Sequence, residues 1–424
     1  MTPAGIPQSE GLDILVLGGG VAGISAAIEA AEAGCNVILI EKSPTLGGRA
    51  VRNQQYFPKL CPPSCGMEIN FQRIRKNPRI HVITQAKLER LEGVPGDFEA
   101  TLKIAPRHVN ANCTQCGACV EVCPAERVDE VNCGLSHTKA AYSPSLTAFP
   151  PWYAIDRQAC PAGCQACVDV CRYSAIDLQQ EPEQKTVRVA AVVAATGWEP
   201  YDAAKIDNLG FGRCRNVVTN VMMERLASLS GPTQGKILRP SDGQPPRSVA
   251  FVQCAGSRDA NHLPYCSAVC CSASLKQTTY LHRQLPECKT TLFYIDLRTP
   301  GLLQDFFSKV TADGSVCLIK GKVGKVEEDA STGDPIVTVE EVMTGKKTST
   351  RFDMVVLATG MVPNTQDLPA GFGLDEFGFV TNESKGLYGA GCVQRPSEVA
   401  SSIRDATGAA LRALQCVVEG LPRG

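Results

Sequence analysis

Short apolar runs and amphipathic stretches alternate along the chain. The run Asp13–Leu17 predicts a buried strand, and a helical pattern follows over 24–33. A second apolar run over 35–40 ends in Glu41. Later apolar runs bounded by turn residues predict further strands at 190–195, 248–253, 290–296 and 354–359. Strands that alternate with helices indicate an α/β fold with parallel sheets.

The turn between the first strand and its helix matches G-x-G-x-x-G, the fingerprint of dinucleotide-binding folds. Gly18 allows the tight turn, Gly20 lets the backbone approach a pyrophosphate, and Gly23 lets helix and strand pack closely. The helix start would stabilise the phosphate charge, and Glu41 would accept a hydrogen bond from a ribose hydroxyl. The predicted cofactor contacts here are Gly18, Gly20, Val21, Ala22, Gly23 and Glu41.

The segment after Glu41 distinguishes FAD from NAD. Its E-K-x-x-x-x-G-G-R pattern resembles the FAD-binding flavoproteins of the glutathione and thioredoxin reductase class. Two apolar strands that end in A-T-G strengthen this resemblance. In that class an Asp usually follows the last glycine of a carboxyl-terminal segment and binds the ribityl chain, but Cys392 stands in its place here. The resemblance adds Lys42, Gly47, Gly48, Arg49, Thr196, Gly197, Gly391 and Cys392 to the expected FAD contacts.

Composition narrows the class of protein. The chain has 424 residues and 21 cysteines. Its formal net charge is −1, so no large electrostatic field favours the binding of nucleic acid or of an anionic membrane. The first residues carry no secretion signal, and no apolar run approaches the roughly 18–20 residues of a membrane helix. Many cysteines without a secretion signal predict metal ligation in a reducing compartment. We therefore expect a cytoplasmic chain that reaches a membrane only through partners.

Eight cysteines fall into two runs that are typical of bacterial ferredoxins. The first run reads C-x₂-C-x₂-C-x₃-C-P, and the second reads C-x₃-C-x₂-C-x₃-C. Such runs hold two [4Fe-4S] clusters, and the last cysteine of each run ligates the other cluster. The interval from Cys160 to Cys164 is irregular. The predicted ligands are Cys113, Cys116, Cys119, Cys123, Cys160, Cys164, Cys167 and Cys171.

A second dinucleotide-like segment has lost its glycine fingerprint. The strand at 248–253 leads into Cys254-Ala-Gly256-Ser-Arg-Asp259, where a single glycine leaves no room for a pyrophosphate. The pattern C-x₁₁-C-x₃-C-C begins here, and its cysteines are either ligands of a third cluster or buried inert thiols. These four are Cys254, Cys266, Cys270 and Cys271. Cys61 and Cys65 could be ligands, a redox pair or flavin-facing residues.

Several long strings resemble the flavoprotein component (HdrA) of heterodisulfide reductase. They also resemble, more closely, the corresponding flavoproteins of quinone-interacting membrane-bound oxidoreductase (Qmo) complexes. The resemblance covers essentially the whole chain and rests on 56–66, 219–225, 251–259, 265–271 and 294–300. It implies an FAD and iron–sulfur electron-transfer subunit in sulfate reduction or sulfur oxidation.

The same resemblance implies three partners. These are a second flavin and iron–sulfur subunit (HdrA-like, of the QmoB type), a haem-bearing membrane subunit (QmoC-like) and adenylylsulfate reductase. No acid–base dyad or nucleophile triad is visible, so we expect no autonomous substrate site on this chain. The alternatives are a flavin bifurcation hub of the heterodisulfide reductase type, an NAD(P)H-dependent flavin reductase, and a thiol–disulfide enzyme that uses Cys61 and Cys65.

The predicted architecture has two Rossmann-like domains, as in thioredoxin and glutathione reductases, with an inserted ferredoxin domain of the 2[4Fe-4S] type. The FAD-binding domain takes residues 1–106, 181–215 and 352–424. The ferredoxin insert takes 107–180, and its stretch 131–153 shows no helical or strand periodicity. The second Rossmann-like domain takes 216–351 and contains an expected hairpin over 322–341.

Overall fold

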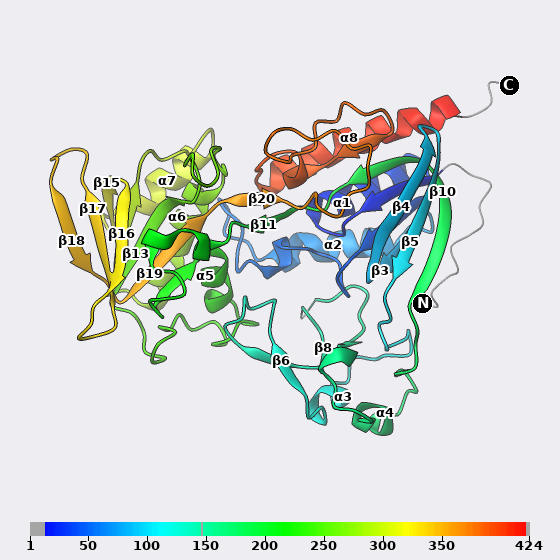
Figure 1. Ribbon diagram of the computed structural model, residues 1–424, viewed down its shortest axis with the longest axis horizontal. Helices are drawn as coiled ribbons and strands as arrows, with labels where there is room; N and C mark the ends of the chain where they lie inside the picture. Colours follow the sequence, from blue (N-terminus) through cyan, green and yellow to red (C-terminus); the bar gives the residue numbers. More distant parts are fainter. Residues whose placement is uncertain (1–12, 146, 421–424) are drawn as a thin grey trace. The chain divides into compact units, whose positions relative to one another are not determined.

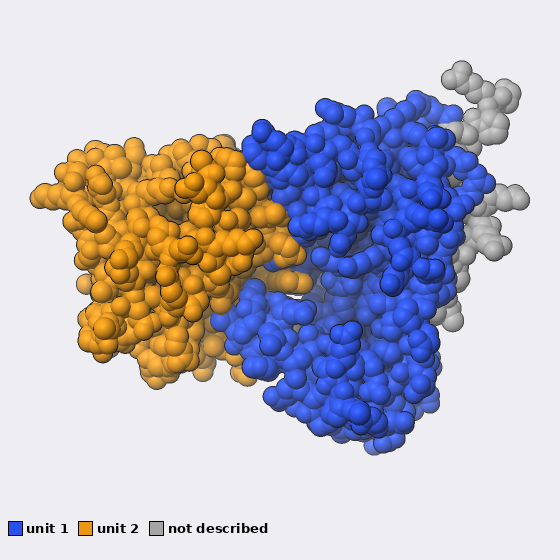
Figure 2. All heavy atoms as spheres, in the orientation of Figure 1, with its two compact units in different colours: residues 1–51, 64–198, 363–424 blue, residues 52–63, 199–362 orange. Residues whose placement is uncertain are grey.

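The computed structural model describes residues 13–145 and 147–420 (Figure 1). It divides the chain into two compact units, which Figure 2 colours separately. Unit 1 takes residues 1–51, 64–198 and 363–424, and unit 2 takes residues 52–63 and 199–362. Among the helices of the described residues, none combines the length and hydropathy needed to span a bilayer.

Unit 1 is built on a seven-stranded sheet. Four strands lie parallel in the order β3-β2-β1-β10, and β21 also pairs with β10 in parallel. The antiparallel strands β4 and β5 extend the sheet beyond β10. The strand bounds are β1 Asp13–Leu17, β2 Val37–Glu41, β3 Ile80–Thr84, β4 Ala86–Val94, β5 Asp97–Ile104, β10 Glu183–Ala194 and β21 Leu387–Gly389.

The strand β10 serves both parts of this sheet. Its first half alternates between exposed and partly buried residues and pairs with β5, as expected of an antiparallel strand with one solvated face. Its second half is fully buried and runs parallel to β1. The helices α1 (Val21–Glu32) and α8 (Val399–Gly420) contact each other and share one hydrophobic core with β1. The predicted α/β flavoprotein-like fold is therefore confirmed.

The ferredoxin insert belongs to unit 1. Two short helices that contact each other carry one predicted ligand each, Cys119 and Cys167. The stretch 131–153 has short strands where the sequence predicted none, because two- and three-residue strands show no measurable alternation. The elements are α3 Ala118–Glu121, β6 Glu126–Val128, β7 His137–Lys139, β8 Ala141–Tyr142, β9 Ala154–Ile155 and α4 Ala166–Val170.

Unit 2 has a five-stranded parallel sheet in the order β12-β19-β13-β14-β15. The expected hairpin is present as β16 and β17, and a third antiparallel strand, β18, continues it. The strand bounds are β12 Val217–Thr219, β13 Ser248–Ala255, β14 Lys289–Tyr294, β15 Val316–Lys320, β16 Val323–Glu328, β17 Pro335–Glu340, β18 Lys347–Arg351 and β19 Met354–Thr359. The helices are α5 Asn220–Ala227, α6 Cys270–Gln284 and α7 Leu303–Thr311.

The boundaries of the units differ from the predicted ones. The strand β19 was expected in the FAD-binding domain, but it pairs with β12 and β13 in unit 2. A buried apolar strand that ends in A-T-G could pair in the sheet of unit 1 or in that of unit 2. Its sequence alone therefore does not identify its partner strands. The first boundary after the insert also lies at 198 rather than 215, and the short strands β11 (Trp198–Pro200) and β20 (Met361–Pro363) mark the crossings.

Residues 52–63 form a second departure, because they belong to unit 2 rather than to the FAD-binding domain. The backbone N–H of Gln54 donates to buried Glu224, and the Lys276 ammonium donates to the carbonyl of Gln55 at 2.7 Å. Lys276 and Glu224 also form a buried ion pair at 2.9 Å. Because a buried charge needs close partners, these contacts hold the segment on unit 2. No local sequence pattern predicts these contacts.

Candidate functional site: a flavin cradle and a ferredoxin insert

Three glycine segments meet at the amino-terminal end of α1. A Cβ placed on Gly23 would lie 1.8 Å from the carbonyl oxygen of Gly18. A Cβ on Gly48 would lie 3.0 Å from the Cα of Gly20, and one on Gly391 would lie 2.9 Å from the Cβ of Ala22. The backbones can approach this closely only because these positions lack side chains. The structure thus brings together, in unit 1, the three glycine segments at 18–23, 47–48 and 391.

Backbone conformation explains two of these glycines further. Gly18 has φ +103° and Gly47 has φ +109°, values that side-chain-bearing residues rarely adopt. The N–H of Gly47 donates to the carbonyl of Gly19 at 2.7 Å, which ties the second glycine pair to the first loop. The cradle lies at the start of α1, whose first N–H groups have no carbonyl partner within the helix. Such an end favours a pyrophosphate.

Glu41 is buried at the end of β2 beside the first glycine loop. One carboxylate oxygen accepts the N–H of Gly19 at 2.6 Å, and the other accepts the N–H of Ser43 at 2.8 Å. Two backbone donors therefore fix its orientation. Each oxygen keeps a second lone pair for a ribose hydroxyl, so the residue fits the predicted role.

The remaining predicted FAD contacts differ in their surroundings: three make hydrogen bonds within unit 1, and Lys42 lies at the surface. Arg49 lies over the Trp198 ring at 4.9 Å and donates to the Trp198 carbonyl at 2.7 Å, so it ties the second glycine pair to the start of β11. Thr196 donates to the carbonyl of Asn364, and the Asn364 amide donates back to the Thr196 carbonyl at 3.1 Å. Gly197 accepts the Asn364 N–H at 3.0 Å. Lys42 is exposed.

Cys392 lies in a short 3₁₀ turn before α8. Its thiol donates to the carbonyl of Ser397 at 3.3 Å and lies 3.8 Å from the Ser402 hydroxyl. Burial raises the pKa of the Cys392 thiol, so it stays neutral at physiological pH. A neutral thiol is a weak acceptor, unlike the Asp usual at this position in the reductase class. Contact with the ribityl chain would therefore fall to the backbone around Gly391.

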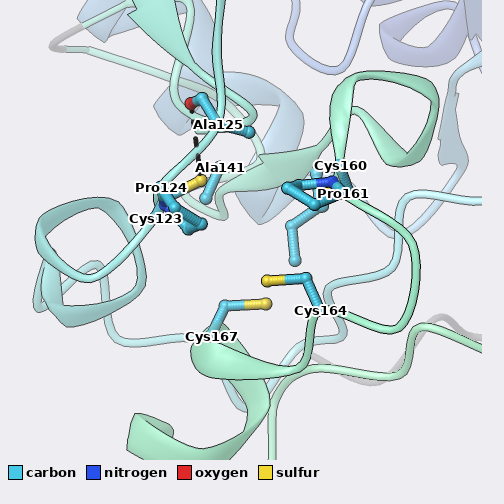
Figure 3. Close-up of a pocket in the computed structure, with 9 residues that line it drawn as sticks. Cys123, Pro124, Ala125, Ala141, Cys160, Pro161, Cys164 and Cys167 are labelled. Atoms are coloured by element: carbon cyan, nitrogen blue, oxygen red, sulfur yellow. Dashed lines mark hydrogen bonds between the residues drawn. The ribbon is translucent and has the colours of Figure 1, made fainter.

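Four of the predicted cluster ligands line one cavity (Figure 3). Cys160, Cys164 and Cys167 belong to the second cysteine run, and Cys123 is the last cysteine of the first run. The sulfur atoms of Cys164 and Cys167 point into the same space. This grouping is the one that cross-ligation by the last cysteine requires. The donor set fits a [4Fe-4S] cluster, and the irregular interval after Cys160 does not remove that residue from the group.

The remaining first-run cysteines gather around buried Cys119. Burial, followed by the charges of Cys113 and Cys116, raises the pKa of Cys119 to about 12. Such a thiol remains protonated until a metal displaces its proton. Cys171 packs against the same hydrophobic core, and its sulfur accepts the N–H of Ala175 at 3.4 Å. These four cysteines are the complementary set of predicted ligands.

The four cysteines of unit 2 also approach one another. Cys254 lies at the end of β13, and Cys270 and Cys271 begin α6. Burial, with a smaller contribution from Cys271, raises the pKa of Cys254 to about 11. The thiol of Cys270 donates to the Thr359 carbonyl at 3.7 Å, and the sulfur of Cys271 accepts the N–H of Arg298 at 3.5 Å. Within the described part of the chain, no three potential ligands lie close enough to share a single metal ion.

The second sheet has no pyrophosphate cradle after β13. A Cβ on Gly256, the one glycine left in this loop, would lie 2.8 Å from the Tyr201 ring and 2.9 Å from the Ile206 side chain. The glycine therefore permits internal packing of unit 2 rather than the approach of a phosphate. Cys61 and Cys65 are both exposed, and their role stays a prediction.

Comparison with known proteins agrees with this geometry. A family model described as FAD dependent oxidoreductase matches residues 13–121, and one described as 4Fe-4S dicluster domain matches residues 112–176. Residues 13–121 therefore resemble FAD-dependent oxidoreductases, and residues 112–176 resemble [4Fe-4S] dicluster domains. The fold of the chain resembles thioredoxin reductase of T. acidophilum, with a TM-score of 0.53 at 14% identity over 97% of this chain and 100% of that one.

Relatives of the chain include subunits A of CoB-CoM heterodisulfide reductases. The chain is 36% identical over 425 residues to the HdrA component of the H(2):CoB-CoM heterodisulfide,ferredoxin reductase of Methanothermobacter marburgensis, covering 96% of this chain and 64% of the relative. It is 33% identical to the HdrA component of the ferredoxin/F(420)H(2)-dependent CoB-CoM heterodisulfide reductase of Methanosarcina acetivorans, covering 96% and 53%. The chain thus spans less than two thirds of these relatives' length.

Proposed function

We propose that this chain is the FAD and iron–sulfur electron-transfer subunit of a membrane-associated oxidoreductase complex, of the QmoA type. The observation that carries the proposal is the presence of the flavin cradle and the dicluster insert in one compact unit. When bound, FAD exchanges two electrons and each cluster exchanges one. The residues of the chain hold these groups, exclude water from them and tune their potentials.

The proposed complex links the quinone pool to adenylylsulfate reductase in dissimilatory sulfur metabolism. Its other members would be a QmoB-like protein with flavin and iron–sulfur centres, together with a haem-bearing QmoC-like membrane protein. Long strings such as Tyr56–Gly66 and Tyr294–Pro300 support this choice. The test is affinity purification of the tagged chain from its native host under anaerobic conditions. Recovery of a haem-bearing membrane protein supports the proposal, and recovery of a heterodisulfide-reducing partner set without haem contradicts it.

A second candidate function is a bifurcation hub of the heterodisulfide reductase type. The relatives favour it, since the Methanothermobacter protein is named as a reductase of both a heterodisulfide and ferredoxin. A hub needs a flavin whose two one-electron potentials are widely separated. Redox titration of the bound flavin decides between the two functions, because a stable one-electron state excludes bifurcation and leaves simple relay.

NADH is expected to leave the flavin oxidised. The loop after β13 provides no pyrophosphate cradle, because the space beside Gly256 is filled by the side chains of Tyr201 and Ile206. Three further cysteines also follow within 15 residues of Gly256. Anaerobic mixing of the purified chain with excess NADH or NADPH, followed at the flavin absorbance band, measures this. Dithionite in the same buffer is the control that bleaches the flavin. Bleaching by either nucleotide within seconds would contradict the proposal.

We further propose a third cluster at Cys254, Cys266, Cys270 and Cys271. The electrostatic influence of these thiols on one another supports it, because burial and then neighbouring cysteines of the set raise the pKa values of Cys254, Cys270 and Cys271. Iron analysis of the fully loaded chain is then expected to give about twelve iron atoms per flavin, at four per cluster. A Cys270→Ser variant should return the ratio to about eight. About eight in the unaltered chain would exclude the third cluster.

A further inference from the structure

Residues 52–63 are a piece of unit 2 that lies between two parts of unit 1 along the chain. The second glycine pair of the flavin cradle precedes them, and α2 (Pro63–Lys76) begins at their last residue. Both ends of the segment are therefore continuous with unit 1, whereas its own packing belongs to unit 2. We call residues 52–63 the strap.

The second half of α5 holds the beginning of the strap. The Arg225 guanidinium donates to the carbonyl of Arg52 at 2.8 Å, and Glu224 accepts the N–H of Gln54 at 2.9 Å. The Arg225 fork also donates to the Ser230 hydroxyl at 2.8 Å, which fixes its orientation. Arg225 and Glu224 are 3% and 4% exposed. Because a buried charge that loses a partner is destabilising, these contacts resist release of the strap.

The Glu224 carboxylate is also oriented by α6. One oxygen accepts from the Lys276 ammonium at 2.9 Å and the Gln277 amide at 2.7 Å. The other accepts from the Tyr280 hydroxyl at 3.1 Å and from the Gln54 N–H of the strap. A carboxylate with two donors on each oxygen has one orientation, so the acceptor for the strap is fixed within unit 2.

The strap begins one turn of chain after the flavin cradle. The 3₁₀ turn η1 (Ala50–Arg52) contains the passage from unit 1 to the strap. Val51, in the middle of this turn, packs against the core of unit 1. A Cβ placed on Gly47 would lie 2.4 Å from a Val51 methyl group, so Val51 contacts the second glycine pair directly. The next residue is the one whose carbonyl Arg225 holds.

Two of the strings on which the family resemblance rests meet at this anchor. Glu224 and Arg225 close the string 219–225, and the strap contains most of the string 56–66. Neither string supplies a glycine of the cradle or a cysteine of the ferredoxin runs. Retention of the strap gives the end of the first string a role that the cradle and the clusters do not.

We propose that Glu224 and Arg225 are positioning residues for FAD, which hold the strap and through it keep the second glycine pair in its binding conformation. With the strap released, the turn after Gly48 loses its fixed end. FAD binding then has to order that turn, and a ligand binds more weakly to a site that it must order. The inference rests on the flavin cradle and not on the proposed partner complex.

The first test compares the FAD dissociation constants of Arg225→Met and the unaltered chain. The variant should bind FAD at least about fivefold more weakly, since ordering even one backbone residue on binding costs about this factor. Its iron content should not change. Arg239→Met is the control, because it removes another ion pair of unit 2, that of Arg239 with Asp334 at 3.1 Å. The control should bind FAD normally.

The second test uses the unaltered chain. Coupling between two sites is reciprocal, so FAD must stabilise the held strap by about the factor by which Arg225→Met weakens FAD binding. Hydrogen exchange of residues 52–61 should slow by that factor when FAD is returned to chain from which it has been removed. Exchange of α7, elsewhere in unit 2, should stay the same, which distinguishes the strap from general stabilisation.

Three results would overturn the inference. One is an unchanged FAD affinity in Arg225→Met. Another is an equal loss of affinity in Arg239→Met, which would assign the effect to the stability of unit 2 as a whole. The third is exchange of residues 52–61 that FAD leaves unchanged while it protects residues 18–23, and this result decides alone if Arg225→Met does not fold. Failure of the unaltered chain to bind FAD would instead reject the flavin cradle.

Discussion

Replacing Cys167 with serine is expected to remove one cluster, about four iron atoms per chain, and to leave FAD bound. Cys167 is buried in α4 and lines the cavity of Figure 3 with Cys160 and Cys164. A serine hydroxyl is a poor substitute for a thiolate ligand of iron. Because the flavin cradle lies in glycine segments outside the insert, flavin content should stay within experimental error of the unaltered chain.

The same prediction separates cross-ligation from ligation within one run. Cys123 belongs to the first run but lines the cavity with the second-run cysteines. Cys123→Ser should therefore erase the same paramagnetic signal as Cys167→Ser, and Cys119→Ser should erase the other. Cys317→Ser is a suitable control, since Cys317 is exposed in β15 of unit 2. If Cys123→Ser and Cys119→Ser removed one common signal, the ligand sets proposed here would be wrong.

Gly23→Ala is expected to weaken FAD binding while leaving the clusters in place. The added methyl group would lie 1.8 Å from the carbonyl oxygen of Gly18, so α1 must move away from the first loop. Overpacking of this kind costs about 1–3 kcal/mol. Since every 1.4 kcal/mol is tenfold in affinity, FAD binding should weaken by about five- to 140-fold.

Flavin absorbance per chain and iron per chain measure this result together. Gly408→Ala is the matched control, because a Cβ on Gly408 in α8 meets no atom within 4 Å. The control should keep a full complement of FAD. Retention of FAD by Gly23→Ala at the level of the control would show that the cradle at α1 is not where the cofactor binds.

Sequence patterns found those parts of the site that depend on local geometry. The glycine fingerprint and the cysteine spacings are short-range devices, and the structure gathers Gly18, Gly23, Cys123 and Cys167 as those patterns require. Long-range features escaped detection. The strand β19 was assigned to the wrong sheet, because its apolar residues carry no information about their partner strand.

Single residues that act through backbone carbonyls escaped as well. Arg107 follows no motif, and its acceptors at Pro44 and Tyr153 are 63 and 46 residues away along the chain. The pairing of Asn364 with Thr196, 168 residues apart, is hidden for the same reason. Such contacts are specified by tertiary packing, so a pattern confined to a short window of sequence does not reveal them.

Anaerobic reductive titration of the loaded chain tests the central claim most directly, because it counts the electrons that the flavin and the clusters take up together. The account predicts about two electrons for FAD and about one for each ferredoxin cluster, hence at least about four per chain, with both cluster signals appearing. An uptake that stops at about two electrons per flavin, without a cluster signal, would contradict the claim that this chain joins a flavin to iron–sulfur clusters.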